Sequence, residues 1–134
     1  MTISDDDLIA RARAAQQHAY APYSHFDVGA ALAAGDRVFE GANVENASYG
    51  LATCAERSAV VAAAYAGVRS IDKVAVCTNA SPPSAPCGSC RQILLELSPD
   101  PSRVRVIAAN TQGERREWTL AQLIPDGFTG KELP

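Results

Sequence analysis

The first segment of the chain has mostly apolar residues at helical spacing. This pattern begins after Ser4, which together with Asp7 resembles a capping box, and it stops at Pro22. The positions that share this spacing are Leu8, Ile9, Ala12, Ala15, Gln16 and Ala19. The pattern predicts an amphipathic helix over about residues 5–20.

Short apolar runs bounded by polar turns predict five strands. The first two runs flank Ala34, Gly35 and Asp36, a sequence typical of a hairpin turn. The third run precedes residues 79–86, whose three prolines and two serines predict a loop. The predicted strands cover residues 28–33, 38–44, 74–76 within the apolar stretch 71–77, 104–109 and 115–118.

Three more helices are predicted between and after these strands. Residues 54–66 are rich in alanine and lead into Gly67, a residue common just past a helix end. Residues 87–97 carry apolar side chains at helical spacing, and residues 119–124 form a last short helical pattern. This alternation favours an α/β fold of three layers, α-β-α, in which helices cover both faces of the sheet.

Composition supports one compact domain over residues 1–134. The chain is 47% hydrophobic and 20% charged, and it shows no internal repeat or linker. Its net charge is −3, and basic residues are adjacent only at Arg115 and Arg116, which argues against binding to nucleic acid or anionic membranes. An acidic N-terminus and the lack of a long apolar stretch indicate a cytoplasmic protein without a membrane segment.

Cysteine spacing provides the first indication of chemistry, since thiols in the cytoplasm stay reduced. Cys87 and Cys90 lie three positions apart at the start of a predicted helix, so one metal ion could meet both. That pair alone is equally compatible with a redox dithiol or half of a structural zinc site. Cys54 opens another helix, and three thiolates can hold zinc while leaving its fourth position open, as in catalytic sites.

Charged residues beside these cysteines fit the same interpretation. Glu56 is two residues from Cys54, where it could exchange protons with a water on the metal; alone, it would be read as a helix-capping acid. Arg57 and Arg91 could donate hydrogen bonds to the sulfurs, or could form ordinary surface salt bridges. Cys77, in an apolar strand, is predicted to be a buried free thiol, and it would be the fourth ligand of a structural site.

The sequence Cys54-Ala55-Glu56, followed by Pro86-Cys87 and Cys90, resembles the three-cysteine form of the zinc nucleobase deaminase signature. Residues 21–26, 28–31, 43–49 and 54–57 are similar to segments of the short-chain, homotetrameric cytidine deaminases. The resemblance spans about residues 5–128 and implies a mixed five-stranded sheet covered by helices on both faces.

The resemblance implies one zinc ion per chain, bound by Cys54, Cys87 and Cys90, with Glu56 as general acid and base. It implies that Phe26 packs on the pyrimidine and that Asn43 and Glu45 bind the ribose hydroxyls. The other implied contacts to substrate are Ala55, Tyr49 and Phe128. Phe128 would act in a neighbouring subunit of a homo-oligomer, expected to be a tetramer with shared sites.

The implied function is hydrolytic deamination of free cytidine and 2′-deoxycytidine to uridine or deoxyuridine and ammonia, as in pyrimidine salvage. A zinc-bound hydroxide would attack C4 while Glu56 moves the proton. Deamination of another base or of a cytosine-bearing antibiotic is the nearest alternative, and Asn43 with Glu45 argues against it. A structural zinc or thiol-redox module is the alternative from another class.

Overall fold

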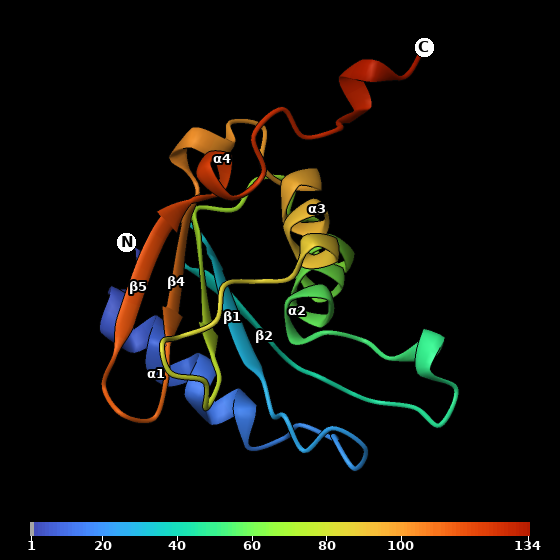
Figure 1. Cartoon of the computed structure of the whole chain (residues 1–134). Coiled ribbons are helices and arrows are strands. Elements are labelled where there is room, and N and C mark those ends of the chain that lie inside the picture. Colours follow the sequence, from blue (N-terminus) through green and yellow to red (C-terminus); the bar gives the residue numbers. More distant parts are fainter. Residues whose placement is uncertain (1) are drawn as a thin grey trace.

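Five strands form one mixed sheet in the order β2-β1-β3-β4-β5 (Figure 1). The computed structural model describes residues 2–134. The strands are β1 (Gly29–Ala34), β2 (Arg37–Ala42), β3 (Lys73–Cys77), β4 (Arg105–Ala109) and β5 (Arg115–Thr119). The helices are α1 (Asp5–Gln16), α2 (Ala55–Tyr65), α3 (Gly88–Glu96) and α4 (Leu120–Leu123). Single 3-10 turns cover Tyr49–Leu51, Pro101–Arg103 and Gly130–Glu132.

Strand direction explains why the sheet is mixed. β1 runs antiparallel to both β2 and β3, and β5 runs antiparallel to β4. Only β3 and β4 are parallel, with Lys73 opposite Arg105. The connection between these two strands carries α3, as a crossover between parallel strands requires.

Helices cover both faces of the sheet, so the predicted three-layer α/β fold is confirmed (Figure 1). On one face α1 packs Leu8 and Ala12 against small and branched side chains of the strands. On the other face α2 and α3 enclose a larger apolar core with the sheet, from side chains such as Leu32, Val74 and Leu94.

Two strand glycines let the helices lie directly on the sheet backbone. A Cβ at Gly41 would lie 2.4 Å from the carbonyl oxygen of Ala55, the first residue of α2. A Cβ at Gly29 would lie 2.1 Å from the carbonyl oxygen of Ala12 in α1. Because real Cβ atoms do not approach so closely, both positions need glycine, and Gly41 sets where the first turn of α2 can sit.

The first helix is shorter than predicted. It ends at Gln16 rather than near residue 20, because Tyr20 pairs with another segment instead of continuing the helix. The backbone N–H of Tyr20 donates to the carbonyl of Asn43 at 2.9 Å, and the carbonyl of Tyr20 accepts from the backbone N–H of Glu45 at 2.8 Å. The same pairing takes residues 43 and 44 out of the predicted second strand, which ends at Ala42.

Across residues 2–134, no helix is both long and apolar enough to cross a membrane.

Candidate metal centre

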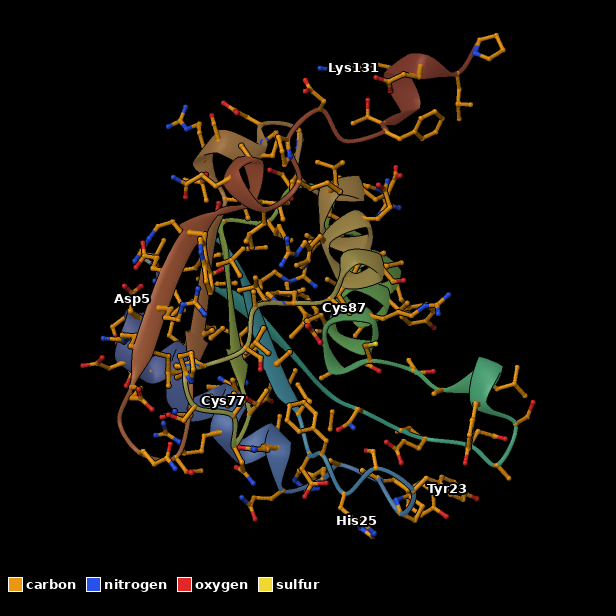
Figure 2. The ribbon with its side chains drawn as sticks, viewed as in Figure 1. Asp5, Tyr23, His25, Cys77, Cys87 and Lys131 are labelled. Atoms are coloured by element: carbon orange, nitrogen blue, oxygen red, sulfur yellow. The ribbon has the colours of Figure 1, made fainter. Side chains whose placement is uncertain are left out.

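Two helix N-termini bring three cysteines together. Cys54 is the N-cap of α2, Cys87 is the N-cap of α3, and Cys90 lies in the first turn of α3. Their Sγ atoms all lie within 4.8 Å of one another, and those of Cys87 and Cys90 are 3.5 Å apart. Figure 2 shows Cys87 where α3 begins, beside the start of α2.

The spacing of these sulfurs fits a tetrahedral zinc ion. Zinc–sulfur bonds of about 2.3 Å place two sulfurs on one zinc about 3.8 Å apart, which falls within the observed separations. The partial positive charges of both helix N-termini offset the negative charge that three thiolates leave on a zinc site. Within the described residues the cluster holds no fourth histidine, cysteine or carboxylate ligand, so a position stays open for water.

Cys77 is not that fourth ligand. It is buried in the core under α1, where its Sγ lies 3.6 Å from the carbonyl oxygen of Ile9 (Figure 2). Burial raises the pKa of its thiol, which keeps it protonated. The prediction of a buried free thiol is confirmed, and the structural zinc site that would need Cys77 is excluded.

The three cysteines differ in how readily they ionise without a metal. Burial raises the pKa of both Cys90 and Cys54. Burial also opposes ionisation of Cys87, but the backbone N–H and thiol of Cys90 outweigh it and hold the pKa of Cys87 below its ordinary value. A bound cation is therefore needed before all three sulfurs can be thiolates at once.

Glu56 is the buried carboxyl group beside this cluster. It lies in the first turn of α2, and only 5% of its surface is exposed. Burial raises its pKa, while a hydrogen bond from Cys90 acts in the opposite direction. A carboxyl group poised toward its neutral form, next to an open metal position, is suited to taking up and returning a proton.

Asn43 and Glu45 hold the loop that contains Phe26. The Asn43 side chain donates from Nδ2 to the carbonyl of Phe26 and accepts at Oδ1 from the N–H of Val28, both at 2.8 Å. The Glu45 carboxylate accepts from the N–H groups of Tyr23 and Ser24 and from the Ser24 hydroxyl. The ribose contacts predicted for these two residues would thus be added to a role in positioning this loop.

The remaining predicted substrate residues are distributed over several segments. Ala55 is fully buried at the start of α2 and can offer only backbone groups and a methyl surface. Phe26 is 42% exposed, and Tyr49 meets Tyr23 edge-on at 5.9 Å. Phe128 lies on a C-terminal segment that extends away from the three layers (Figure 1).

Neither arginine donates a hydrogen bond to a ligand sulfur within the described residues. Arg91 does not donate to sulfur: its Nε donates to the carbonyl of Pro86 at 2.7 Å and its Nη1 to that of Leu123 at 2.9 Å. The Arg91 guanidinium thus binds the carbonyl groups that precede Cys87 and end α4, in place of a sulfur. Arg57 is exposed and makes no hydrogen bond to a ligand sulfur within residues 2–134, so its role beside the ligands stays a prediction.

Gln16 and Gln92 also lie in the surroundings of the site, and neither was among the predicted site residues. Gln16 has a signal in the sequence, since a polar residue occupies a position at apolar spacing in α1. Gln92 donates from Nε2 to the carbonyl of Phe128 at 2.8 Å and so anchors the C-terminal segment on α3. Nothing in the spacing of Gln92 marks that contact.

Comparison with known proteins agrees with this geometry. Residues 2–107 match the family described as the cytidine and deoxycytidylate deaminase zinc-binding region. The chain is 45% identical over 127 residues to a cytidine deaminase of Halalkalibacterium halodurans, covering 94% of this chain and 95% of that relative. It is 40% identical to one from Sporosarcina psychrophila, with coverage of 96% and 93%.

Solved structures show the same likeness. A crystal structure of cytidine deaminase from Burkholderia pseudomallei superposes with a TM-score of 0.89 at 46% identity, covering 94% of this chain and all of that one. A cytidine deaminase from Mycobacterium tuberculosis superposes with a TM-score of 0.80 at 37% identity, over 94% and 98% of the two chains. Fold, cysteine cluster and sequence therefore agree, and the chain belongs to the family of the cytidine and deoxycytidylate deaminase zinc-binding region.

Proposed function

We propose that this protein is a zinc-dependent deaminase that hydrolyses free cytidine and 2′-deoxycytidine to the uridine and ammonia. The observation that carries the proposal is the juxtaposition of three cysteine sulfurs within 4.8 Å and the buried Glu56 in the adjoining helix turn. The cytidine deaminases to which the chain is 40–45% identical support the choice of substrate. One domain, residues 1–134, would carry the whole reaction.

Cys54, Cys87 and Cys90 would hold a zinc ion, which would supply the Lewis-acid chemistry that makes a water acidic near neutral pH. Glu56 takes up the proton that this water loses and transfers it to N3 of the cytosine ring. The oxygen of this water adds to C4 of the cytosine ring. Glu56 then takes the remaining proton from the hydroxyl group formed at C4 and delivers it to N4. The C4–N4 bond then breaks, and the amino group leaves as ammonia, which leaves the C4 carbonyl of the product. One carboxylate thus serves several transfers.

The residues around the open position would hold the nucleoside. Phe26 offers an aromatic face for the pyrimidine, and Asn43 and Glu45 offer an amide and a carboxylate for the two ribose hydroxyls. Hydrogen bonds from Ser24 lower the pKa of Glu45 and keep it ionised, which makes it a stronger acceptor for a hydroxyl. A sugar-bearing substrate would use both polar residues, whereas a free base would use neither.

We also propose a homo-oligomer, a tetramer, whose copies complete each other's sites. The outer face of α2 exposes apolar surface, with Val61 60% and Tyr65 94% exposed, beside a hollow of about 550 Å³. Tyr49 and Phe128 stand on segments that project from the body in Figure 1, so they can reach a neighbour more readily than their own cluster. A cytoplasmic location, which we also propose, would keep the ligand thiols reduced.

The competing classes fail on different observations. A polynucleotide deaminase would need a basic channel, and the net charge here is −3. A thiol-redox module would use the Cys87 and Cys90 pair without needing Cys54 or Glu56.

The decisive experiment measures zinc per chain and ammonia release from cytidine, deoxycytidine, cytosine, CMP and adenosine. Glu56→Gln should retain one zinc per chain yet lose about 100-fold or more in kcat, because a positioned acid–base group contributes about 10² to 10⁴. Glu96→Gln, at the exposed far end of α3, is the matched control and should keep full activity. Full activity in metal-free protein, or in Glu56→Gln, would contradict the proposal.

A further inference from the structure

We infer that Gln16 is a positioning residue for the deaminase site, which fixes Phe26 relative to the loop that leads to Cys87. Gln16 closes α1, on the opposite face of the sheet from the cysteine cluster, and only 5% of its surface is exposed. Its Nε2 atom donates to the carbonyl of Asp27 and to Oδ1 of Asn79, both at 3.0 Å. Both amide hydrogens are thus directed to two different loops.

The two loops leave the sheet side by side. Residues 26–28 lead into β1, and residues 78–86 lead out of β3 toward α3. These strands are neighbours, with Gly29 opposite Cys77, so their loops meet at one end of the sheet. Gln16 bridges them at this point, and one loop bears Phe26 while the other ends at the ligand Cys87.

The position of Gln16 is itself fixed by the sheet. A Cβ on Gly29 would lie 2.4 Å from the backbone nitrogen of Gln16 and 2.8 Å from its Cα. The last turn of α1 therefore rests on the strand backbone, with no space through which it could slide. A side chain anchored in this way transmits the position of β1 to the loops that it binds.

The segment containing Phe26 needs such support. His25 has a φ of 57°, in the left-handed region that non-glycine residues seldom adopt. Asn43 already holds the carbonyl of Phe26 and the N–H of Val28. Gln16 holds the carbonyl of Asp27, between these two groups, so two amide side chains from different segments of the chain restrain three consecutive residues.

Only a donor of this length performs the task. Both partners of Nε2 are acceptors, so a carboxylate at position 16 would repel them and an apolar side chain would leave them unpaired. Methionine has a similar length and no donor, which makes Gln16→Met the informative variant. Gln17→Met is its matched control, because Gln17 is the next residue along the same chain and is exposed.

This inference rests on the proposed function, in which Phe26 contacts the pyrimidine, so its test has one arm without substrate. Hydrogen–deuterium exchange of residues 20–28 should be about tenfold faster in Gln16→Met than in Gln17→Met, because a supporting hydrogen bond is lost. Zinc content should be the same in both. Equal exchange in the two variants would overturn the inference whatever the enzyme's activity.

The second arm is a double-mutant cycle on KM for cytidine. Gln16→Met should raise KM about fivefold with kcat within about twofold, and it should add nothing to Phe26→Ala, because it acts through that side chain. An unchanged KM, or equal effects with and without Phe26, would overturn the inference. If Phe26→Ala leaves KM unchanged, the proposed role of Phe26 fails, and the exchange experiment still decides on Gln16.

Asn79→Ala is a second variant that tests the inference if Gln16→Met does not fold. Asn79 is exposed, and its side chain accepts only one of the two hydrogen bonds from Gln16. Asn79→Ala should quicken exchange in residues 78–86 and raise KM about twofold, again without adding to Phe26→Ala. Unchanged exchange in that loop would count against the link.

Discussion

Arg91 reaches back along its own helix to donate from Nε to the carbonyl of Pro86, 2.7 Å away, the peptide group immediately before the ligand Cys87. Its Nη1 holds the carbonyl of Leu123 at the end of α4. The Arg91 guanidinium therefore supports the turn that carries Cys87, and it makes no hydrogen bond to the Cys87 sulfur. It also connects that turn to the segment that continues to Phe128.

Replacing Arg91 should weaken zinc binding. Arg91→Leu removes both hydrogen bonds and a nearby positive charge, so zinc affinity should fall about tenfold, as for other groups that orient metal ligands. The rate of zinc release to a chelator measures this. Gln92→Leu, one residue along, loses only the contact to the Phe128 carbonyl and should release zinc at the wild-type rate. Equal release from all three proteins would show that Arg91 does not support the ligand turn.

Glu45 should discriminate substrates by their sugar. Glu45→Gln keeps an oxygen for the N–H groups of Tyr23 and Ser24 but weakens the bond to a hydroxyl. We expect kcat/KM for cytidine to fall about tenfold, corresponding to about 1.4 kcal/mol, while that for cytosine stays within about twofold.

Glu45→Ala should lower kcat/KM for both substrates, because it also releases the loop that holds Phe26. Zinc content should not change in either variant. An equal loss on cytidine and cytosine for Glu45→Gln would show that the carboxylate serves only the scaffold.

Phe128 tests whether sites are shared between copies. Phe128→Ala should raise KM for cytidine about tenfold, the loss expected for an aromatic contact, with zinc retained. Leu133→Ala is the matched control, since Leu133 is another exposed apolar residue of the C-terminal segment. Mixing Phe128→Ala chains with inactive Glu56→Gln chains should recover activity, because some sites then combine intact halves. A fully active monomer in light scattering would contradict shared sites.

Asp5 should make stability depend on acid pH. Its carboxylate accepts hydrogen bonds from Arg105 at 2.6 and 3.0 Å and from Lys73 at 2.9 Å, and these partners lower its pKa well below the ordinary value. A lowered pKa means that the stabilisation is fully present above the ordinary pKa of about 3.9 and is lost as the pH falls toward the folded-state value.

Asp5→Asn should therefore reduce the free energy of unfolding by about 1 kcal/mol at pH 7, a partly exposed pair being screened by solvent, and by less at pH 3. Denaturant unfolding at the two pH values measures the difference. Asp7→Asn is the control, because it lies in the same helix turn and forms no salt bridge within the described residues. A deficit in Asp5→Asn that does not shrink at pH 3 would rule out this account.

The strands and helices followed from local patterns, whereas their ends depended on partners far away in the sequence. Periodicity placed the start of α1 correctly but could not show that Tyr20 pairs with the segment around Val44. Cysteine spacing and helix starts predicted the cluster, because each ligand lies at an N-cap or in the first turn of a helix. The destination of Arg91 was not predictable, since Pro86 and Leu123 become its neighbours only after the chain has folded.

The division of the sheet into two unlike faces has a practical consequence for engineering. The cysteine cluster and Glu56 lie with α2 and α3, while the strands under α1 contribute alanines, Ile107 and Cys77. A Cys77→Ala variant would leave the three ligands as the protein's only thiols. Reagents that label free thiols would then react only with centres that lack a metal ion, so the amount of label would measure metal occupancy directly.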